Sequence, residues 1–311
     1  MHKFDYLIDK IHTSEFCDYP FQHINIFNFF SEEHFQKIVS DKQIFRSEFK
    51  NVEEMIDDLI EQGYGPQPFP GCITSIKDYI NFINDPQSSF DRGLIEGYGK
   101  EIIEGYGLTM RLKRYDSEFL NDLVDFFDGE NFISCITSKF GVTGELDIET
   151  AIQKNLYGYE ISPHCDTRKK ALTYMANIYT SSEAEAASIH THLLKFKPHR
   201  QHLYDFWRYN SDIDTCWVPW DWCDTVKETK YNNSIIIFKP DFNTLHAVKL
   251  NYDHLKYQRN QIYGNLWYKE NRHAYAGDYK MIDLITPFEK QKDEGLKSKI
   301  IRMTKSLLDK I

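Results

Sequence analysis

The sequence predicts an α+β fold in which an antiparallel β-sandwich or barrel is flanked by helices. Residues 1–150 mix short amphipathic helical patterns with loops. From about residue 152, short runs rich in β-branched and aromatic residues follow one another without long helical patterns between them. Residues 296–311 return to helical spacing. We expect a single domain over 1–311, with a helical layer over 1–150, a β core over 151–270 and a C-terminal helical tail over 271–311.

Two segments of the first 150 residues carry signals of helix ends. Asn51 and Glu54 form a capping-box pattern before VEEMIDDLIEQ, and Gly63 lies where a C-terminal cap is expected. Apolar residues recur with helical spacing over 119–127, directly after Ser117. We expect these helices to pack as a layer beside the sheet.

The strands are predicted from runs that are bounded by Pro, Asn and Asp. These runs are LYGYEIS, ALTYMANIY, SIIIFKP, LHAVKL and RNQIYGNLWYK. Short strands without long helices between them are typical of antiparallel sandwiches and barrels.

Composition excludes several classes of partner. The net charge is -10 and no long block of basic residues occurs, so we expect no nucleic-acid partner. No run approaches the roughly 18 apolar residues of a membrane span, and the N-terminus lacks the apolar core of a signal peptide. The six cysteines form no CxxC pair. We therefore expect a cytoplasmic protein with reduced thiols and no membrane association.

The segment SPHCDTRKKALTYMANIY places polar residues directly before an apolar run. Side chains two apart on an extended chain project to the same face, so His164 and Asp166 could hold one metal ion. Cys165 then points to the opposite face, as a small buried apolar residue. A third candidate ligand, His246, follows the strand SIIIFKP and a polar turn, 80 residues beyond Asp166. Two histidines and one carboxylate on one face of an octahedron are typical of non-haem Fe(II) oxygenases.

Arg259 lies 13 residues beyond His246 and opens the run RNQIYGNLWY. A permanently charged guanidinium can hold a carboxylate with two parallel hydrogen bonds. This would suit a dicarboxylate cosubstrate that chelates the metal with its other end.

Together these motifs resemble those of the 2-oxoglutarate and Fe(II)-dependent dioxygenase superfamily, in particular its prolyl-hydroxylase-like branch. The matching stretches are HCD, FKPDFNTLHAVK and the arginine before QIYGNLWY, and YPFQHINIFNFFSEEHF is similar to the leading segment of that branch. The resemblance covers about residues 19–40 and 115–270. It implies a double-stranded β-helix, or jelly roll, as the catalytic core, with the helical layer and the C-terminal helix flanking it.

The resemblance also implies the chemistry and its residues. His164, Asp166 and His246 would hold Fe(II), and Arg259 would bind the distal carboxylate of 2-oxoglutarate. The expected reaction is hydroxylation of a C–H bond of a small-molecule or peptide substrate by dioxygen, with release of succinate and CO2. The carboxylate of Asp166 favours hydroxylation over halogenation, because related halogenases have a small residue at this position.

Further contacts to the cosubstrate are expected on neighbouring strands. The candidates are Tyr157, Tyr159 and Asn177, and Gln261 occupies the position where some branches have a serine. Many relatives have a short Gly-Gly-Glu-like turn after the strand that matches ALTYMANIY, whereas this chain has a long segment rich in Trp and Asp. We expect residues 181–230 to be an insertion, either packed onto the core or acting as a lid over the substrate.

Two other functions are consistent with the sequence. One is a non-catalytic jelly-roll protein that binds a carboxylate ligand or a partner through the acidic, aromatic insertion. The other is a cupin-like metal enzyme that uses His190 and His192 as ligands. The sequence predicts neither the substrate nor the oligomeric state.

Overall fold

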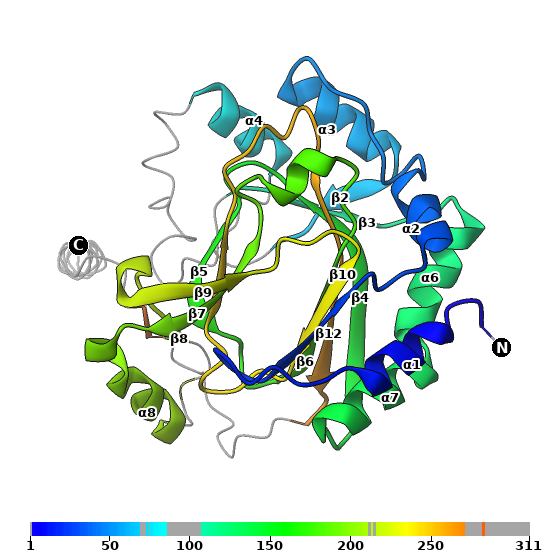
Figure 1. The fold of residues 1–311 in the computed structure, drawn as a ribbon. Coiled ribbons are helices and arrows are strands. Elements are labelled where there is room, and N and C mark those ends of the chain that lie inside the picture. The colour runs from blue at the N-terminus through cyan, green and yellow to red at the C-terminus, as the bar shows by residue number, and fades with distance from the viewer. Residues whose placement is uncertain are drawn as a thin grey trace, which may run out of the picture.

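A computed structural model of the chain describes residues 2–68, 73, 75–85, 107–210, 213, 216–270 and 282–283. The expected C-terminal helix over 296–311 lies outside these residues. The described part combines helices with two mainly antiparallel sheets, in agreement with the predicted class (Figure 1). No helix among the described residues is long and apolar enough to cross a membrane.

Within the described residues, the first sheet has seven strands in the order β1-β10-β6-β12-β4-β3-β2, and all neighbours run antiparallel. Its strands are β1 (His23–Phe27), β2 (Tyr64–Pro66), β3 (Thr109–Leu112), β4 (Leu146–Asn155), β6 (Lys170–Asn177), β10 (Ser234–Phe238) and β12 (Arg259–Tyr268). The first 150 residues therefore contribute strands to the sheet as well as the expected helices.

The second sheet has six described strands in the order β13-β8-β5-β11-β7-β9, of which only β13 and β8 run parallel. Its strands are β5 (Glu160–Cys165), β7 (Thr191–Phe196), β8 (Cys216–Trp217), β9 (Cys223–Glu228), β11 (His246–Lys249) and β13 (Ile282–Asp283). Strands β7, β8 and β9 lie inside the segment that we expected to be an insertion, so part of this segment belongs to the sheet.

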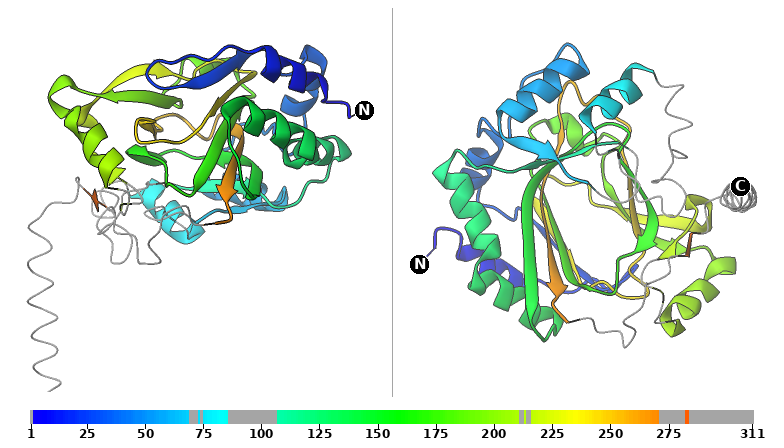
Figure 2. Two further views of the ribbon diagram at one scale, coloured as in Figure 1. Left: turned by 90° about the horizontal axis from the view of Figure 1, so that it is seen from below. Right: turned by 180° about the vertical axis from the view of Figure 1, so that it is seen from behind.

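Helices cover the outer side of the first sheet, and α8 lies beside the second sheet (Figures 1 and 2). The helices are α1 (Tyr6–Thr13), α2 (Glu32–Val39), α3 (Val52–Glu61), α4 (Ile76–Asn84), α6 (Glu118–Asp128), α7 (Glu130–Phe140) and α8 (His202–Tyr209). The predicted start of α3 is confirmed, because the Asn51 side chain accepts a hydrogen bond from the backbone N–H of Glu54. Ser117 caps α6 in the same way, through the N–H of Leu120.

Strand β12 shows how the sheet separates an apolar core from a polar interior. Ile262 and Leu266 belong to the largest buried apolar cluster, which also contains the buried faces of the helices. The alternate positions Arg259, Tyr263 and Trp267 line a cavity that residues of both sheets enclose. Because side chains alternate along a strand, one strand supplies both environments.

Lys154 on β4 is a fully buried lysine on the helix side of the sheet. Its Nζ donates to the carbonyl of Ile44 at 2.8 Å and to Oδ1 of Asn260 at 2.7 Å. Burial, followed by repulsion from Arg46, lowers the pKa of Lys154 from 10.5 to about 7. Between about pH 7 and pH 10.5, the folded protein therefore binds fewer protons at Lys154 than the unfolded chain does.

This difference predicts how stability depends on pH. Since the unfolded chain keeps the proton on Lys154 up to 10.5, the free energy of unfolding should gain about 2 kcal/mol from this lysine between pH 7 and pH 9. The gain should be absent in Lys154→Met and present in Lys169→Met, which removes an exposed lysine. Urea unfolding of the three proteins at both pH values measures it. An equal pH dependence in wild type and Lys154→Met would show that Lys154 is protonated in the folded state.

Candidate metal centre

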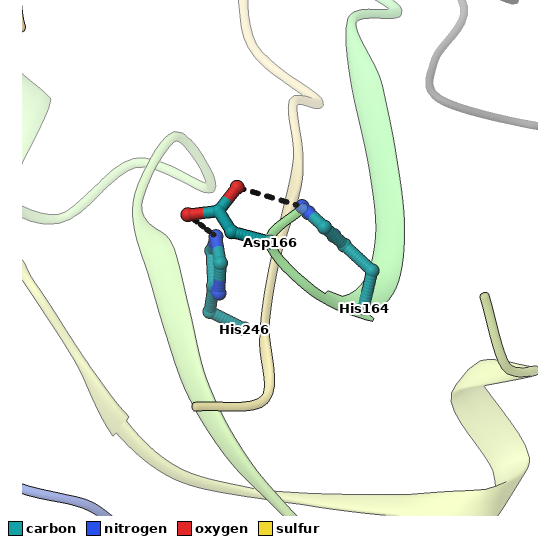
Figure 3. A group of neighbouring side chains, drawn as sticks. All are labelled: His164, Asp166 and His246. Carbon is teal, nitrogen blue, oxygen red and sulfur yellow. Dashed lines mark ion pairs between the residues drawn. The ribbon is translucent and has the colours of Figure 1, made fainter. Parts of the chain in front are cut away.

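His164, Asp166 and His246 meet at the edge of the cavity. Each offers a ligand atom, and these atoms lie within 4.8 Å of one another. Nε2 of His164 lies 3.8 Å from Oδ1 of Asp166, and Nε2 of His246 lies 3.8 Å from Oδ2. Figure 3 shows both imidazoles directed at the carboxylate. In the part of the chain that the structure describes, this is the only group of three or more His, Cys, Asp or Glu residues that could hold a metal ion.

The two strands β5 and β11 explain why residues far apart in sequence meet. They are antiparallel neighbours in the second sheet, and His246 is paired directly with His164. Asp166 follows the last residue of β5, two positions beyond His164. The spacing within HCD and the register of the two strands together build the group.

Each imidazole is oriented by a carbonyl two residues earlier in the chain. Nδ1 of His164 lies 2.8 Å from the carbonyl oxygen of Ser162, and Nδ1 of His246 lies 2.8 Å from that of Thr244. A carbonyl oxygen only accepts, so both Nδ1 atoms carry the proton and both Nε2 atoms keep a lone pair for a metal ion.

Burial and neighbouring charges set the protonation of the group. Burial, and next the proximity of His164, lowers the pKa of His246 to about 4, so this imidazole is neutral at pH 7. Burial raises the pKa of Asp166, but Lys170 and the two histidines outweigh this and hold it well below its ordinary value. The group therefore presents neutral imidazole and ionised carboxylate, which is the form that binds metal.

Lys170 and Thr173 support the carboxylate, and our sequence reasoning missed both. Nζ of Lys170 donates to Oδ1 of Asp166 at 2.6 Å, and Oγ1 of Thr173 donates to Oδ2 at 3.1 Å. Burial lowers the pKa of Lys170, but the ion pair with Asp166 more than offsets this, so the net pKa is raised. The sequence signal was the position of Lys170 as the first residue of β6: side chains alternate along a strand, so Lys170 could face the cavity while the adjacent Lys169 is exposed.

The cavity beside this group has a volume of about 160 Å³. Its lining includes the three candidate ligands, together with Arg259 at one end of β12 and Trp267 near the other end. The predicted metal ligands and the predicted carboxylate-binding arginine therefore share one cavity.

Arg259 is almost fully buried and has only uncharged partners among the described residues. Nε donates to the carbonyl of Ile189 at 2.6 Å, Nη2 donates to Oγ1 of Thr191 at 3.0 Å, and Nη1 donates to Oδ1 of Asn155. No carboxylate of the described chain forms an ion pair with it. A buried cation without a counter-ion is costly, so this end of the cavity is suited to an anionic ligand.

Two of the four additional cosubstrate candidates line the cavity. These are Tyr159 and Gln261. Asn177 does not line it: its amide nitrogen donates to the carbonyls of Thr229 and Tyr231, and its Oδ1 accepts a hydrogen bond from Gln261 at 2.8 Å. Asn177 thus supports Gln261 from behind and does not reach the cavity.

Tyr157 was predicted to lie near the cosubstrate, and the structure places it elsewhere. It lies in the turn between β4 and β5, is 38% exposed, and its ring lies beside Phe82 and His254. The turn contains Gly158 with φ +78°, so Tyr157 lies outside both strands rather than on a strand that faces the cavity.

The alternative ligands His190 and His192 do not belong to any group of three candidate ligands in the described chain, although a carboxylate oxygen of Glu228 lies 3.6 Å from Nδ1 of His192. Nε2 of His190 lies 3.1 Å from the carbonyl of Glu185, whereas Nδ1 of His192 lies 3.1 Å from Oγ1 of Thr225. These two histidines contact separate groups rather than a shared position.

Among the tryptophans of residues 181–230, only Trp217 lines the cavity. Its indole stacks on the imidazole of His164, with 4.1 Å between the ring centroids. Trp207, Trp220 and Trp222 pack instead in an apolar cluster around β7 and α8. Trp220 and Trp222 therefore pack onto the core, which is one of the two arrangements expected for this segment, and they do not line the cavity.

Comparison with protein-family models and with curated proteins gave no match. Solved structures that match this chain include a prolyl-4-hydroxylase from Pseudomonas putida, with a TM-score of 0.43 and 8% identity, over 86% of this chain and 99% of that chain. A prolyl hydroxylase from Trichoplax adhaerens, in complex with a peptide fragment of the hypoxia inducible factor oxygen degradation domain, has a TM-score of 0.41 and 10% identity, over 85% of this chain and 88% of that chain.

A third similar structure is an oxidoreductase of the 2OG-Fe(II) oxygenase family from Burkholderia pseudomallei. It has a TM-score of 0.30 and 12% identity, and the match covers 72% of this chain and 94% of that chain. These structural neighbours are prolyl hydroxylases and a 2OG-Fe(II) oxygenase, the family that the sequence motifs resemble.

Proposed function

We propose that this protein is an Fe(II)- and 2-oxoglutarate-dependent dioxygenase that hydroxylates a C–H bond of a small-molecule or peptide substrate. The observation that carries the proposal is that one cavity holds a buried His-Asp-His group and a buried arginine without an anionic partner in the described chain. The first feature suits a metal ion, and the second suits the far carboxylate of a chelating cosubstrate.

The order of the strands supports a double-stranded β-helix as the catalytic core. Strands β4, β6, β10 and β12 are contiguous in the first sheet, and β5, β7, β9 and β11 are contiguous in the second. Apart from the step from β7 to β9, the chain passes from one sheet to the other with each of these strands in turn. This placement brings the end of β5 and the start of β11 together at the cavity.

The donor set fits Fe(II). Two neutral imidazole nitrogens and one carboxylate oxygen are the ligands of non-haem Fe(II) oxygenases, and they leave coordination positions open. When bound, iron with 2-oxoglutarate supplies the oxidation: one oxygen atom of dioxygen enters the substrate, and the other enters succinate as CO2 is released. The chain's own task is to hold His164, Asp166 and His246 in their ligating protonation states.

The remaining residues orient the cosubstrate and limit water. Arg259 and Thr191 lie side by side and can both donate to a carboxylate, with Gln261 and Tyr159 on the same cavity wall. The Trp217 ring covers one face of His164, and the edge of Phe238 lies against His246, 5.1 Å between centroids. These rings shield the imidazoles from solvent.

Anaerobic addition of Fe(II) and 2-oxoglutarate tests the proposal. We expect a weak visible charge-transfer band, because a keto acid chelated to Fe(II) absorbs in this region, and we expect succinate when air is admitted. Absence of the band with correctly folded protein would favour the non-catalytic binding protein. A band without any succinate after admission of air would contradict the dioxygenase activity.

A further inference from the structure

We infer that the substrate carries an anionic group, a carboxylate or a phosphate, which Lys170 binds once metal and cosubstrate are in place. This inference rests on the proposed function and names the substrate class of the same site. It is carried by the position of Lys170 and by the charges that the cavity presents.

Lys170 lies on the opposite side of the candidate metal centre from Arg259. It opens β6 and is paired with Trp267, near the end of β12, whereas Arg259 opens that strand. Its Nζ lies 5.4 Å from the ring centroid of Trp267 and 3.3 Å from the hydroxyl of Tyr263. Because Lys170 contacts Asp166 and Arg259 contacts Thr191, a dicarboxylate held by Arg259 would approach the metal from the side away from Lys170.

Lys170 faces the cavity while remaining largely shielded from water. It lines the cavity, and its side chain is 10% exposed. Its only carboxylate partner in the described chain is Asp166. The ion pair of Lys170 therefore depends on Asp166, which the proposed function assigns to the metal as a ligand.

The charges of the cavity are not balanced once the site is loaded. Of the cavity-lining side chains that the structure describes, four carry charge at pH 7: Glu149, Asp166, Lys170 and Arg259. Glu149 is already paired with Arg111. The metal dication, Asp166 and Arg259 together leave two positive charges, and 2-oxoglutarate neutralises both.

The charge of Lys170 then remains without a counter-ion. Before loading, the full charge of Asp166 offsets it, but a carboxylate that ligates a dication no longer does so. An unbalanced buried cation is unfavourable, and an anionic group on the substrate removes the imbalance. The rings of Tyr263 and Trp267 flank Lys170 and offer an apolar surface for the carbon skeleton that carries the reacting C–H bond.

Binding of small probes to the loaded protein tests this without turnover. Mn(II) replaces iron, 2-oxoglutarate is present, and the paramagnetic relaxation of the probe nuclei reports binding near the metal. The probes are acetate, inorganic phosphate and acetamide, the last of which matches acetate in shape but is uncharged. We expect acetate or phosphate, and not acetamide, to bind near the metal.

Variants of Lys170 and of the adjacent Lys169 show whether Lys170 is the residue that binds the anionic probe. Lys170→Met should weaken binding of the anionic probe by about tenfold or more, because a charge-assisted hydrogen bond is lost. Lys170→Arg should retain most of the binding, and the exposed Lys169→Met should retain all of it. Binding of acetate alone identifies a carboxylate substrate, and binding of phosphate alone identifies a phosphate ester.

Three results would overturn the inference. Acetamide binding as well as acetate, or Lys170→Met binding the anion as well as wild type, would exclude recognition by this lysine. Absence of any probe binding to a site shown to contain Mn(II) and 2-oxoglutarate would do the same. Failure of Mn(II) and 2-oxoglutarate themselves to bind is measured first, and it would instead refute the proposed function on which the inference rests.

Discussion

Replacing His246 with alanine is expected to weaken Fe(II) binding by more than about 100-fold, since changes to residues that only support metal ligands already cost 10- to 100-fold. Two ligands remain in the variant, and the carboxylate of Asp166 loses one of the two imidazoles that face it. Succinate formation should fall below detection. Anaerobic titration with Fe(II), followed by the charge-transfer band with 2-oxoglutarate, measures the effect.

His192→Ala is the matched control for His246→Ala. His192 also lies in the second sheet, is paired with Ala247 next to His246, and does not belong to the group of candidate ligands. The His192→Ala variant should retain wild-type affinity for Fe(II). The reverse result, with metal lost in His192→Ala and kept in His246→Ala, would support the cupin-like alternative. Circular dichroism of both variants confirms that the fold is retained.

Replacing Arg259 with methionine is expected to raise the Kd of 2-oxoglutarate by about 100-fold or more, because loss of one partner of a buried ion pair costs roughly 3–5 kcal/mol. Fe(II) affinity should change little, since Arg259 forms no described contact with the three ligands. Arg259→Lys should lie between the two proteins, because an ammonium keeps the charge but loses the planar pair of donors. Titration of the charge-transfer band with 2-oxoglutarate measures all three affinities.

Loss of stability has to be separated from loss of the cosubstrate contact. Arg259→Met leaves the buried acceptors of Ile189 and Thr191 without a donor and removes one of the two donors to Oδ1 of Asn155, so its thermal stability should also fall. Arg46→Met breaks a partly buried ion pair with Asp58 away from the cavity, and serves as the control. It should lower stability without changing 2-oxoglutarate affinity. Unchanged affinity in Arg259→Met would contradict the assigned carboxylate site.

The predictions that succeeded depend on short-range patterns. The β-branched and aromatic residues of ALTYMANIY and RNQIYGNLWY predicted β6 and β12, and Asn51 predicted the start of α3, because these preferences and hydrogen bonds are set within a few residues. The spacing of His164 and Asp166 similarly placed both side chains on one side of the chain. Their meeting with His246 was expected only through the resemblance to a known family.

Two expectations depend on where the chain turns and on which strands pair. Tyr157 was a candidate for a cosubstrate contact through the resemblance, but it lies in the turn that contains Gly158, and its ring lies beside Phe82. Residues 181–230 were expected to be an insertion because many members of the family that the motifs resemble have a short Gly-Gly-Glu-like turn at this point. Strands β7 and β9 are stabilised by pairing with each other and with β11, and the sequence of the segment does not show this pairing.

The sequence by itself determined which chemical groups are present and how neighbouring side chains alternate along each strand. These groups are an HxD pair, a later histidine, and an arginine that opens a strand. Only the tertiary structure decided which side chains share the cavity, including Lys170 against Asp166 and Trp217 against His164. The physical reason is that a side chain's direction along a strand follows from neighbouring residues, whereas its partners across a cavity follow from strand register and sheet packing. Those depend on contacts between segments that lie far apart in the chain.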